Sequence, residues 1–357
     1  MPPRHRTRSE REQLELFRAL PGDLAPRDAQ DLMAYPFFSL AKTHRTAPID
    51  YRMNEIAIRV EAVPEHGMAT IWDADVLIWA ASQIVEAADQ GLKTSRFFRF
   101  TPYQLLIAVD RGPGQSQYVR LKRALQRLQS TVVMTTIRHG INWRRMQFSW
   151  INEWEELVDA RGRCHGVEFV LPEWFYRGVL DRSLVLTIDS AYFALTGGIE
   201  RWLYRVARRH AGHQPQGWAF ELRHLYAKSG SAARFSDFAL DLRRIATSRT
   251  LPGYDLFIEL ENTRELLRVI PRRLSTGTVD SRVEPIRRSG ARVIRRSGAR
   301  LSADQAHGPQ LSLWPATPSG ARNDSNLRES NSSVVGPRKA GIRSGGAVPL
   351  SRPGRRR

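Results

Sequence analysis

Residues 116–130 combine amide and arginine side chains at a spacing that could read the edges of DNA bases. On a helical wheel, four apolar residues fall on one face: Tyr118, Leu121, Leu125 and Leu128. The opposite face has no acidic residue and collects Ser116, Gln117, Arg120, Arg123, Ala124 and Arg127, with Lys122 at its rim. Arginine pairs bidentately with guanine, and glutamine with adenine, in the major groove. The pattern predicts a recognition helix; the alternative is a solvated basic face.

The stretch after this helix has the composition of a wing, a β-hairpin beside a recognition helix. Residues 131–137 are β-branched and strand-like, and residues 143–150 are typical of a returning strand. The turn and its flank supply the basic and amide side chains Arg138, Asn142, Arg144 and Arg145. Wings commonly touch phosphates or the minor groove. We therefore expect these residues to contact DNA, unless the hairpin tip is only solvated.

A weaker version of the helix pattern recurs 117 residues further along the chain. Its apolar face holds Phe235, Phe238, Leu242 and Ile245. Its outward face holds Arg234, Asp237, Leu240, Asp241 and Arg244. The two acidic residues weaken the case for base reading, and Leu240 indicates that part of the face packs on protein. Candidate phosphate contacts here are Arg234, Arg243, Arg244 and Arg249. A further basic stripe, which could equally be solvated, comprises Arg201, Arg205, Arg208 and Arg209.

The elements that position the first recognition helix follow the order of a winged helix. Asp73 is placed to cap a helix that ends near residue 89, and Thr101–Pro102 begins a short helix to about residue 109. Residues 111–114 break the chain, and Ser116 is placed to cap the third helix. Two helices joined by a turn and followed by a hairpin predict a helix-turn-helix with a wing.

The downstream half repeats this order: a long helical region over 189–210 after the cap Asp189, helices over 219–228 and 232–248, and strands over 254–260 and 266–270. The repeated order indicates an internal duplication. We therefore predict an α+β, helix-rich fold with two tandem winged-helix domains, at residues 31–160 and 161–274.

The two ends of the chain are basic. Residues 1–30 are expected to form a flexible leader with one helical patch over 14–20. Residues 275–357 hold 16 Lys+Arg against 5 Asp+Glu and repeat IRRSGAR at 286–292 and 294–300. This Arg/Ser/Gly/Pro-rich composition predicts a disordered C-terminal tail. The tail is either a counterion-releasing arm for nucleic acid or an unconstrained extension.

Composition excludes several classes of protein. The chain has 357 residues, a formal net charge of +19 and a pI near 11.0, which favours a polyanionic partner. The single cysteine, Cys164, allows neither an internal disulfide nor a cysteine zinc site and is expected to be a buried, inert thiol. No apolar run is long enough to span a membrane, and acidic residues interrupt any N-terminal signal peptide. We expect a cytoplasmic protein.

Signatures of an enzyme are absent from the sequence. There is no P-loop motif, and the pair His210 and His213 lacks the glutamate of an HExxH zinc motif. Solvated or capping histidines are the simpler interpretation. The acids Glu153, Glu155, Glu156 and Asp159 are expected to form an exposed turn, although a two-metal cluster is the alternative. We expect no catalytic residue, no cofactor and no metal.

Several segments resemble the plasmid replication initiator protein A family of bacteria. They are DLMAYPFFSLAKTHR at 31–45, GMATIWDADVLIWAASQI at 67–84, FRFTPYQLL at 98–106, LPEWFYRGVL at 171–180 and RWLYRVARRHAG at 201–212. The resemblance covers roughly residues 31–274 and leaves out the tail.

This resemblance implies a non-enzymatic initiator that binds short repeats in double-stranded origin DNA. Such proteins help to open the duplex, recruit host initiator proteins and the replicative helicase, and often interconvert between homodimer and monomer. The alternatives are a winged-helix transcriptional repressor without replication activity and an origin-nicking nuclease. The acids of the second helix leave open which domain dominates base readout.

Overall fold

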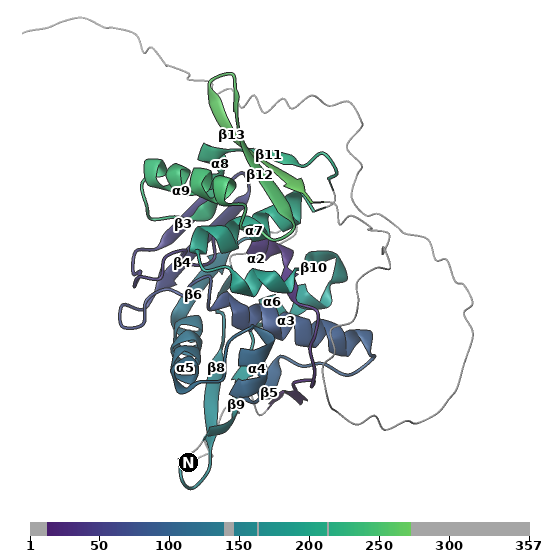
Figure 1. Ribbon diagram of the computed structural model, residues 1–357. Helices are drawn as coiled ribbons and strands as arrows, with labels where there is room; N and C mark the ends of the chain where they lie inside the picture. Colours follow the sequence, from purple (N-terminus) through teal and green to yellow (C-terminus); the bar gives the residue numbers. More distant parts are fainter. Residues whose placement is uncertain (1–12, 139–145, 163, 213, 273–357) are drawn as a thin grey trace, which may run out of the picture. The chain divides into compact units, whose positions relative to one another are not determined.

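The computed structural model describes residues 13–138, 146–162, 164–212 and 214–272, which all lie within the first unit of the chain, Met1–Asp280 (Figure 1). The fold is α+β, with helices packed around several small sheets. The basic tail, 275–357, and the first residues of the leader lie outside this description. None of the helices described is both long and apolar enough to cross a membrane.

The first helix-turn-helix lies where the sequence predicts it. In chain order, the first segment comprises α3 (Ala74–Asp89), β5 (Phe97–Phe100), α4 (Pro102–Ala108), α5 (Gln115–Ser130), β6 (Thr131–Thr135) and β7 (Met146–Ser149). Thr101 caps α4 through a capping box: its hydroxyl accepts from the Gln104 amide, and the Gln104 side chain accepts from the Thr101 amide. Helix α5 begins two residues earlier than expected, because its N-cap is Gly114 and not Ser116.

Strands β6 and β7 extend a hairpin that precedes α3. The hairpin consists of β3 (Ile49–Met53) and β4 (Ile56–Ala62), and the four strands form an antiparallel sheet in the order β3-β4-β6-β7. One face of this sheet buries Ile49, Tyr51, Ile58, Val60 and Val133. The alternation of buried and exposed residues along β3 and β4 is the period-two pattern visible in the sequence.

A second four-stranded sheet crosses the expected domain boundary at residues 160/161. Its order is β1 (Leu16–Arg18), β5, β9 (Cys164–Val170) and β8 (Glu153–Val158). The helical patch expected over 14–20 is therefore wrong: Leu16–Arg18 is a strand, so folded structure begins before residue 31. The acidic turn expected over 153–159 is also wrong, because Glu153, Glu155 and Glu156 lie in β8, paired with β9.

The downstream half starts with short elements that anchor it to the N-terminal residues. Helix α6 (Glu173–Leu180) precedes β10 (Val185–Thr187), which pairs antiparallel with β2 (Arg27–Ala29), just before α2 (Gln30–Ala34). Short 3₁₀ turns flank β10 at Arg182–Leu184 and Ser190–Ala194. Asp189 caps the second turn, but α7 (Gly198–His210) begins only after Gly197, so the helical region expected over 189–210 is interrupted.

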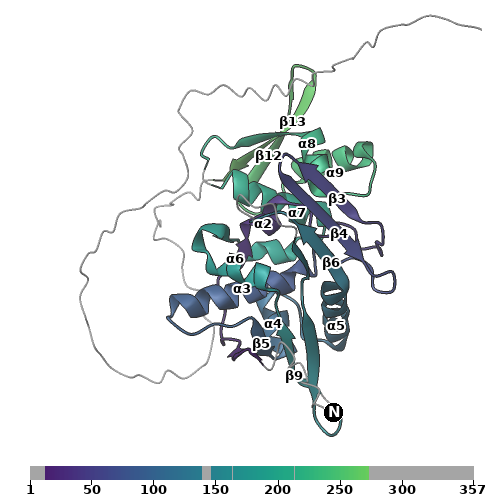
Figure 2. The same ribbon diagram turned by 180° about the vertical axis from the view of Figure 1, so that it is seen from behind.

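The second segment then repeats the element order of the first. It comprises α7, β11 (Trp218–Glu221), α8 (Leu222–Ser229), α9 (Phe235–Ser248), β12 (Tyr254–Glu261) and β13 (Arg264–Pro271). Gly230 ends α8 in the left-handed conformation, at φ 61°, which makes the tight turn into α9. Strand β11 joins the hairpin in a sheet of order β11-β13-β12. Figure 1 shows α5 beside β8, and Figure 2 shows α9 near β12.

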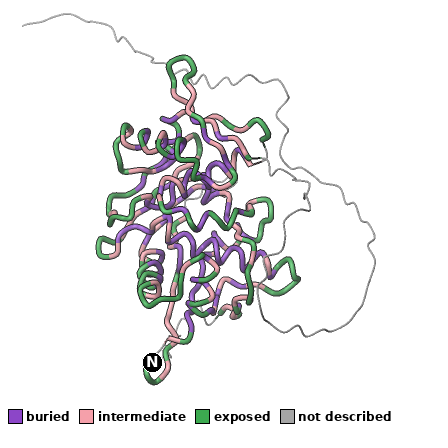
Figure 3. Tube along the Cα trace, viewed as in Figure 1, coloured by how far each residue is buried: buried purple, intermediate pink, exposed green. Residues whose placement is uncertain are grey.

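Helix α3 forms the centre of the core. Nearly all of its residues are buried, from Ala74 to Val85, whereas α5 and α9 each bury one face (Figure 3). An aromatic cluster around the fully buried Trp150 packs nearby, with Phe38 stacked on it at a centroid distance of 5.1 Å. This core holds α5 against the rest of the unit, so the groups on its free faces have fixed positions.

Candidate nucleic-acid interface

The apolar face of α5 is buried as the sequence predicts, but its free face differs from the expected one. Leu121, Leu125 and Leu128 are buried, and Tyr118 is half-buried. Ala124, expected to face outward, is also buried. The exposed residues of the helix are Gln115, Ser116, Val119, Arg120, Lys122, Arg123, Gln126 and Gln129. The free face is therefore centred nearer to Val119 and Gln126 than the wheel placed it.

Arg127 is held in a paired contact rather than standing free. Its Nε and Nη2 each lie 2.7 Å from a carboxylate oxygen of Asp73, the residue before α3. Asp73 also accepts hydrogen bonds from the amide and hydroxyl of Thr70, at 2.8 and 3.0 Å. The hydrogen bonds between Arg127 and Asp73 raise the pKa of the Arg127 guanidinium above its ordinary value. The expected base-reading role of Arg127 does not fit this position, because the guanidinium already joins α5 to α3.

The other predicted residues of α5 have different surroundings. Lys122 forms an ion pair with Glu156 of β8, with Nζ 2.5 Å from the carboxylate. Arg120 and Arg123 are exposed, and within the described part of the chain no carboxylate pairs with either. Ser116 is exposed, and Gln117 is half-buried. Arg120, Arg123 and Ser116 thus remain available to a ligand.

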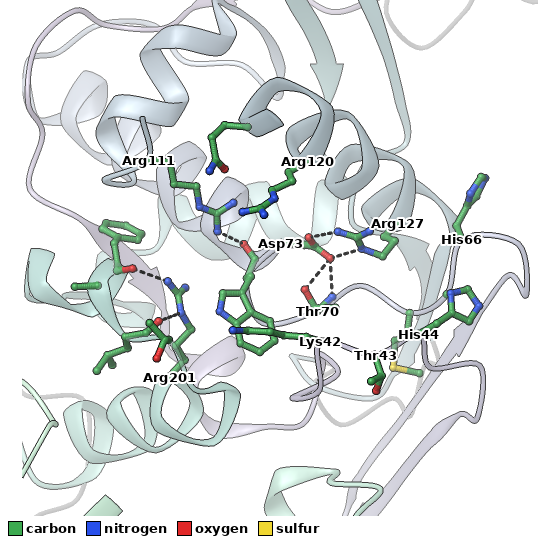
Figure 4. Close-up of a pocket in the computed structure, with 18 residues that line it drawn as sticks. Lys42, Thr43, His44, His66, Thr70, Asp73, Arg111, Arg120, Arg127 and Arg201 are labelled. Carbon is green, nitrogen blue, oxygen red and sulfur yellow. Dashed lines mark hydrogen bonds and ion pairs between the residues drawn. The ribbon is translucent and has the colours of Figure 1, made fainter. Parts of the chain in front are cut away.

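A basic cleft of about 550 Å³ opens beside the N-terminal half of α5 (Figure 4). Gln117, Arg120 and Arg127 line it from α5, and the loop over residues 42–44 lines it from another side. Its charged lining consists of five cationic side chains, Lys42, Arg111, Arg120, Arg127 and Arg201, and the single carboxylate of Asp73. An excess of cations around a concave surface concentrates a field that attracts phosphate groups.

The cleft also contains aromatic side chains. Trp72 is half-buried, and the ammonium group of Lys42 lies 5.2 Å from the centroid of its ring. Phe193 and His44 contribute further rings to the lining. Gly67 is required at the rim, because it adopts φ 73° and a Cβ there would lie 2.8 Å from His44 Nδ1.

Sequence reasoning from residue types did not single out Lys42, Trp72 or Arg111. The basic stretch Lys42–Arg45 could have pointed to this cleft, but it was noted only as part of the family-like segment at 31–45.

Buried ion pairs lie beneath the cleft and join distant parts of the chain. Arg201 of α7 donates from Nη1 to Asp75 Oδ1 at 2.7 Å, and Arg111 donates from Nη2 to Asp75 Oδ2 at 2.6 Å. Arg205 is fully buried and binds both oxygens of Asp28, at 2.7 and 3.0 Å. These two members of the expected basic stripe are therefore interior, not solvated. They join α7 to α3 and to β2.

Only one predicted wing residue lies within the described chain. Arg138 donates from Nε to Asp31 Oδ2 at 2.5 Å and from Nη1 to the Trp174 carbonyl at 2.8 Å. Its guanidinium also stacks 4.2 Å from the centroid of the Trp174 ring. Asp31 and Trp174 thus hold the half-buried side chain of Arg138, and a phosphate contact for this residue stays a prediction. Asn142, Arg144 and Arg145 lie outside the described residues.

In the second segment, most of the candidate arginines have carboxylate partners. Arg234 pairs with Asp237 and Arg244 with Asp241, both at 3.1 Å, and Arg243 binds Glu265 of β13 at 2.6 and 3.1 Å. Arg249 is the C-cap of α9 in the left-handed conformation, with an exposed side chain. Leu240 is 51% exposed, so none of the described residues provides the packing on protein expected for it.

The remaining titratable candidates have structural surroundings. His210 packs between Trp218 and Phe220, and burial lowers its pKa to about 4. His213 lies outside the described residues. Cys164 is half-buried in β9, where burial raises the pKa of the thiol. Among the described residues, no group of three His, Cys, Asp or Glu side chains is arranged to hold a metal ion.

Comparisons with known proteins agree with this description. The family model "Replication initiator protein A" matches residues 27–256. A protein of Wigglesworthia glossinidia brevipalpis named "Putative replication protein" is 30% identical over 228 residues, which cover 63% of this chain and 82% of that protein. A crystal structure of domains 2 and 3 of RctB, from selenomethionine derivatives, aligns with a TM-score of 0.50 and 12% identity over 68% of this chain and 97% of that one. It shows similarity of fold alone.

Proposed function

Because the chain belongs to the replication initiator protein A family, we propose that it binds repeated sites in the double-stranded DNA of a plasmid origin and starts replication there. The observation that carries this proposal is the surface of α5. This helix follows a helix and a turn, has no acidic residue, and presents Arg120 and Arg123 without carboxylate partners among the described residues. Such a helix suits the major groove.

The proposal assigns separate tasks to the residues of the first segment. Arg120 and Arg123 read bases. Gln117 and Ser116, near the N-terminal end of α5, are further proposed DNA contacts. Asn142, Arg144 and Arg145 remain the proposed wing contacts to phosphates. Arg127 and Lys122 position the helix through their ion pairs with Asp73 and Glu156. A fixed helix favours recognition, because less conformational freedom is lost on binding.

The repeated element order supports two tandem winged helices in this function. The second segment supplies Arg249 as a phosphate contact, while Arg234, Arg243 and Arg244 would first have to leave their carboxylate partners. We further propose that the protein acts without catalysis, in the cytoplasm, and that it recruits host initiator proteins and the replicative helicase. A homodimer is the proposed alternative state of the monomer.

Binding of the full-length protein to restriction fragments of its plasmid, at two salt concentrations and with competitor DNA, tests the proposal. We expect selective retention of one fragment that carries short direct repeats, and the salt slope then counts the phosphate contacts. Equal retention of all fragments would contradict origin recognition. Maintenance of a plasmid only when the protein is supplied separates an initiator from a repressor that binds the same DNA.

A further inference from the structure

The basic cleft has the wrong size for the ligand of the proposed function. Its volume of about 550 Å³ lies within the range of about 300–1,000 Å³ that is typical of small-ligand sites. A DNA duplex is too wide to enter such a space, because even one of its grooves, the major groove, is about 12 Å wide. The duplex would lie across α5, and something of nucleotide size would be needed to fill the cleft.

The lining of the cleft combines the two features that single strands require. Lys42 is exposed, with no carboxylate partner within the described part of the chain, and Arg120 reaches in from α5. Trp72 offers a half-buried ring whose contact with Lys42 is a cation–π pair, not a buried packing contact. Proteins that bind single strands use cationic grooves for the backbone and aromatic rings on which bases stack.

The walls of the cleft are rigid. Arg127 is fixed by Asp73, while Arg111 and Arg201 share Asp75 at 2.6 and 2.7 Å. The backbone is close as well, because a Cβ on Gly198 would lie 1.8 Å from the Leu40 carbonyl and 3.0 Å from the Trp72 ring. Lys42 is exposed and makes no ion pair within the described residues. Its side chain can therefore move away from Trp72 while the rest of the site keeps its shape.

We propose that this cleft binds an unpaired nucleotide of single-stranded DNA, with the base on Trp72 and its phosphates on Lys42 and Arg120. The positive charge continues out of the cleft along α5, since Arg123 lies outside it and is unpaired within the described residues. This continuity favours a strand over a free nucleotide. The inference rests on the proposed function in one respect, because origin opening supplies the single strand.

Fluorescence anisotropy with labelled single-stranded dT20, on the full-length protein, tests the site. We expect Trp72→Leu to weaken binding of dT20 about tenfold. Lys42→Ala should lower the slope of log affinity against log salt by about 0.7. Matched controls are Trp218→Leu, at an exposed tryptophan on β11, and Lys93→Ala, at an exposed lysine paired with Glu15. Both controls should bind dT20 within twofold of the parent.

Unchanged dT20 binding in both cleft variants, or equal losses in the controls, would overturn the proposal. So would competition by dTMP as strong as that by dT20, because it would mark a free-nucleotide site. Circular dichroism checks folding, and Lys42→Ala keeps the test decisive if Trp72→Leu does not fold. Binding of the origin duplex should stay within twofold in both variants. A parent that binds dT20 but not the origin would contradict the proposed function and leave this inference standing.

Discussion

The two helix-turn-helix segments have one element order and two different surfaces. In both, a helix and a strand precede the paired helices, and a hairpin follows. In the first segment the helix α5 carries no acid, and its exposed arginines Arg120 and Arg123 are unpaired within the described residues. In the second, Asp237, Asp241 and Glu265 pair with arginines on or beside α9. The common backbone order therefore does not determine what each segment binds.

Their sheets differ as well. Strand β11 joins its own hairpin in the order β11-β13-β12, which makes the second segment self-contained. The equivalent strand β5 instead lies between β1 and β9, and the first hairpin joins the sheet of β3 and β4 by pairing with β4. The first segment thus shares its sheets with strands from the rest of the unit. The second segment contacts the rest of the unit mainly through α7. Arg201 and Arg205 make that attachment.

The largest effect should come from breaking this attachment. Arg205→Leu leaves the buried Asp28 carboxylate without its partner, so we expect the free energy of unfolding to fall by about 3–5 kcal/mol. Arg177→Leu, at an exposed ion pair of α6, should change it by less than about 1 kcal/mol. Urea unfolding measures both variants. A loss below about 1 kcal/mol for Arg205→Leu would mean that this ion pair does not hold α7 to β2.

We expect arginine substitutions in α5 to weaken DNA binding more than matched substitutions in the second segment. Arg120→Ala and Arg123→Ala should each weaken origin binding by about 1–3 kcal/mol and relax specificity at one base pair. Arg234→Ala and Arg244→Ala, matched exposed arginines of the second segment, should have little effect because Asp237 and Asp241 already neutralise them. Titration of repeat-containing duplexes and their single-base variants measures this. Equal losses in the two helices would refute the distinction.

Acid should weaken the second segment selectively. The pKa of His210 is lowered to about 4 by burial and by the nearby cations Lys228, Arg209 and His224. Because the pKa of His210 is lower in the folded state, the unfolded state takes up this proton first as the pH falls. The contribution of His210 to the free energy of unfolding is therefore present above about pH 6.5 and is lost as the pH falls towards 4. We expect a loss of about 1–2 kcal/mol at full protonation, smaller than the whole shift because the ring is not fully buried. His210→Phe should flatten the profile between pH 6.5 and 4 in thermal unfolding, whereas His66→Phe, on the cleft rim, should keep the slope.

The smallest effect should come from removing acids of α9. Asp237→Asn and Asp241→Asn release Arg234 and Arg244, so non-specific DNA affinity should rise a few-fold. The salt slope should steepen by about 0.9 for each new phosphate contact. Glu173→Gln, which removes the carboxylate paired with both Arg177 and Arg96, is the control. An unchanged slope in the α9 variants would place that helix away from DNA.

Local patterns predicted the helices well, because their signals lie within a few residues. Thr101–Pro102 marks the start of α4, and the apolar spacing of Leu121, Leu125 and Leu128 marks the buried face of α5. The three-residue strands β1 and β2 escaped prediction, because their pairing partners are far away in the sequence.

The roles of individual arginines were hidden for the same reason. Arg120 and Arg127 lie on one face of the wheel, and only Asp73, 54 residues from Arg127, distinguishes them. Likewise, the sequence gives no sign that Arg205 belongs to Asp28, 177 residues away. The cleft combines the loop over residues 42–44 with α5 and the turn before α7, and so it could not be assembled from residue spacing alone.

The shared carboxylate of Asp75 has a consequence for the layout of the origin. Arg111 precedes α5 and Arg201 belongs to α7, so separating the two segments would break the buried ion pair between Arg201 and Asp75. In the proposed function, the two segments would therefore contact the duplex at a fixed separation. Whatever the second segment touches must recur in phase with the helical repeat of about 10.5 base pairs. Five extra base pairs between the two contacts would turn the second one to the far side of the duplex.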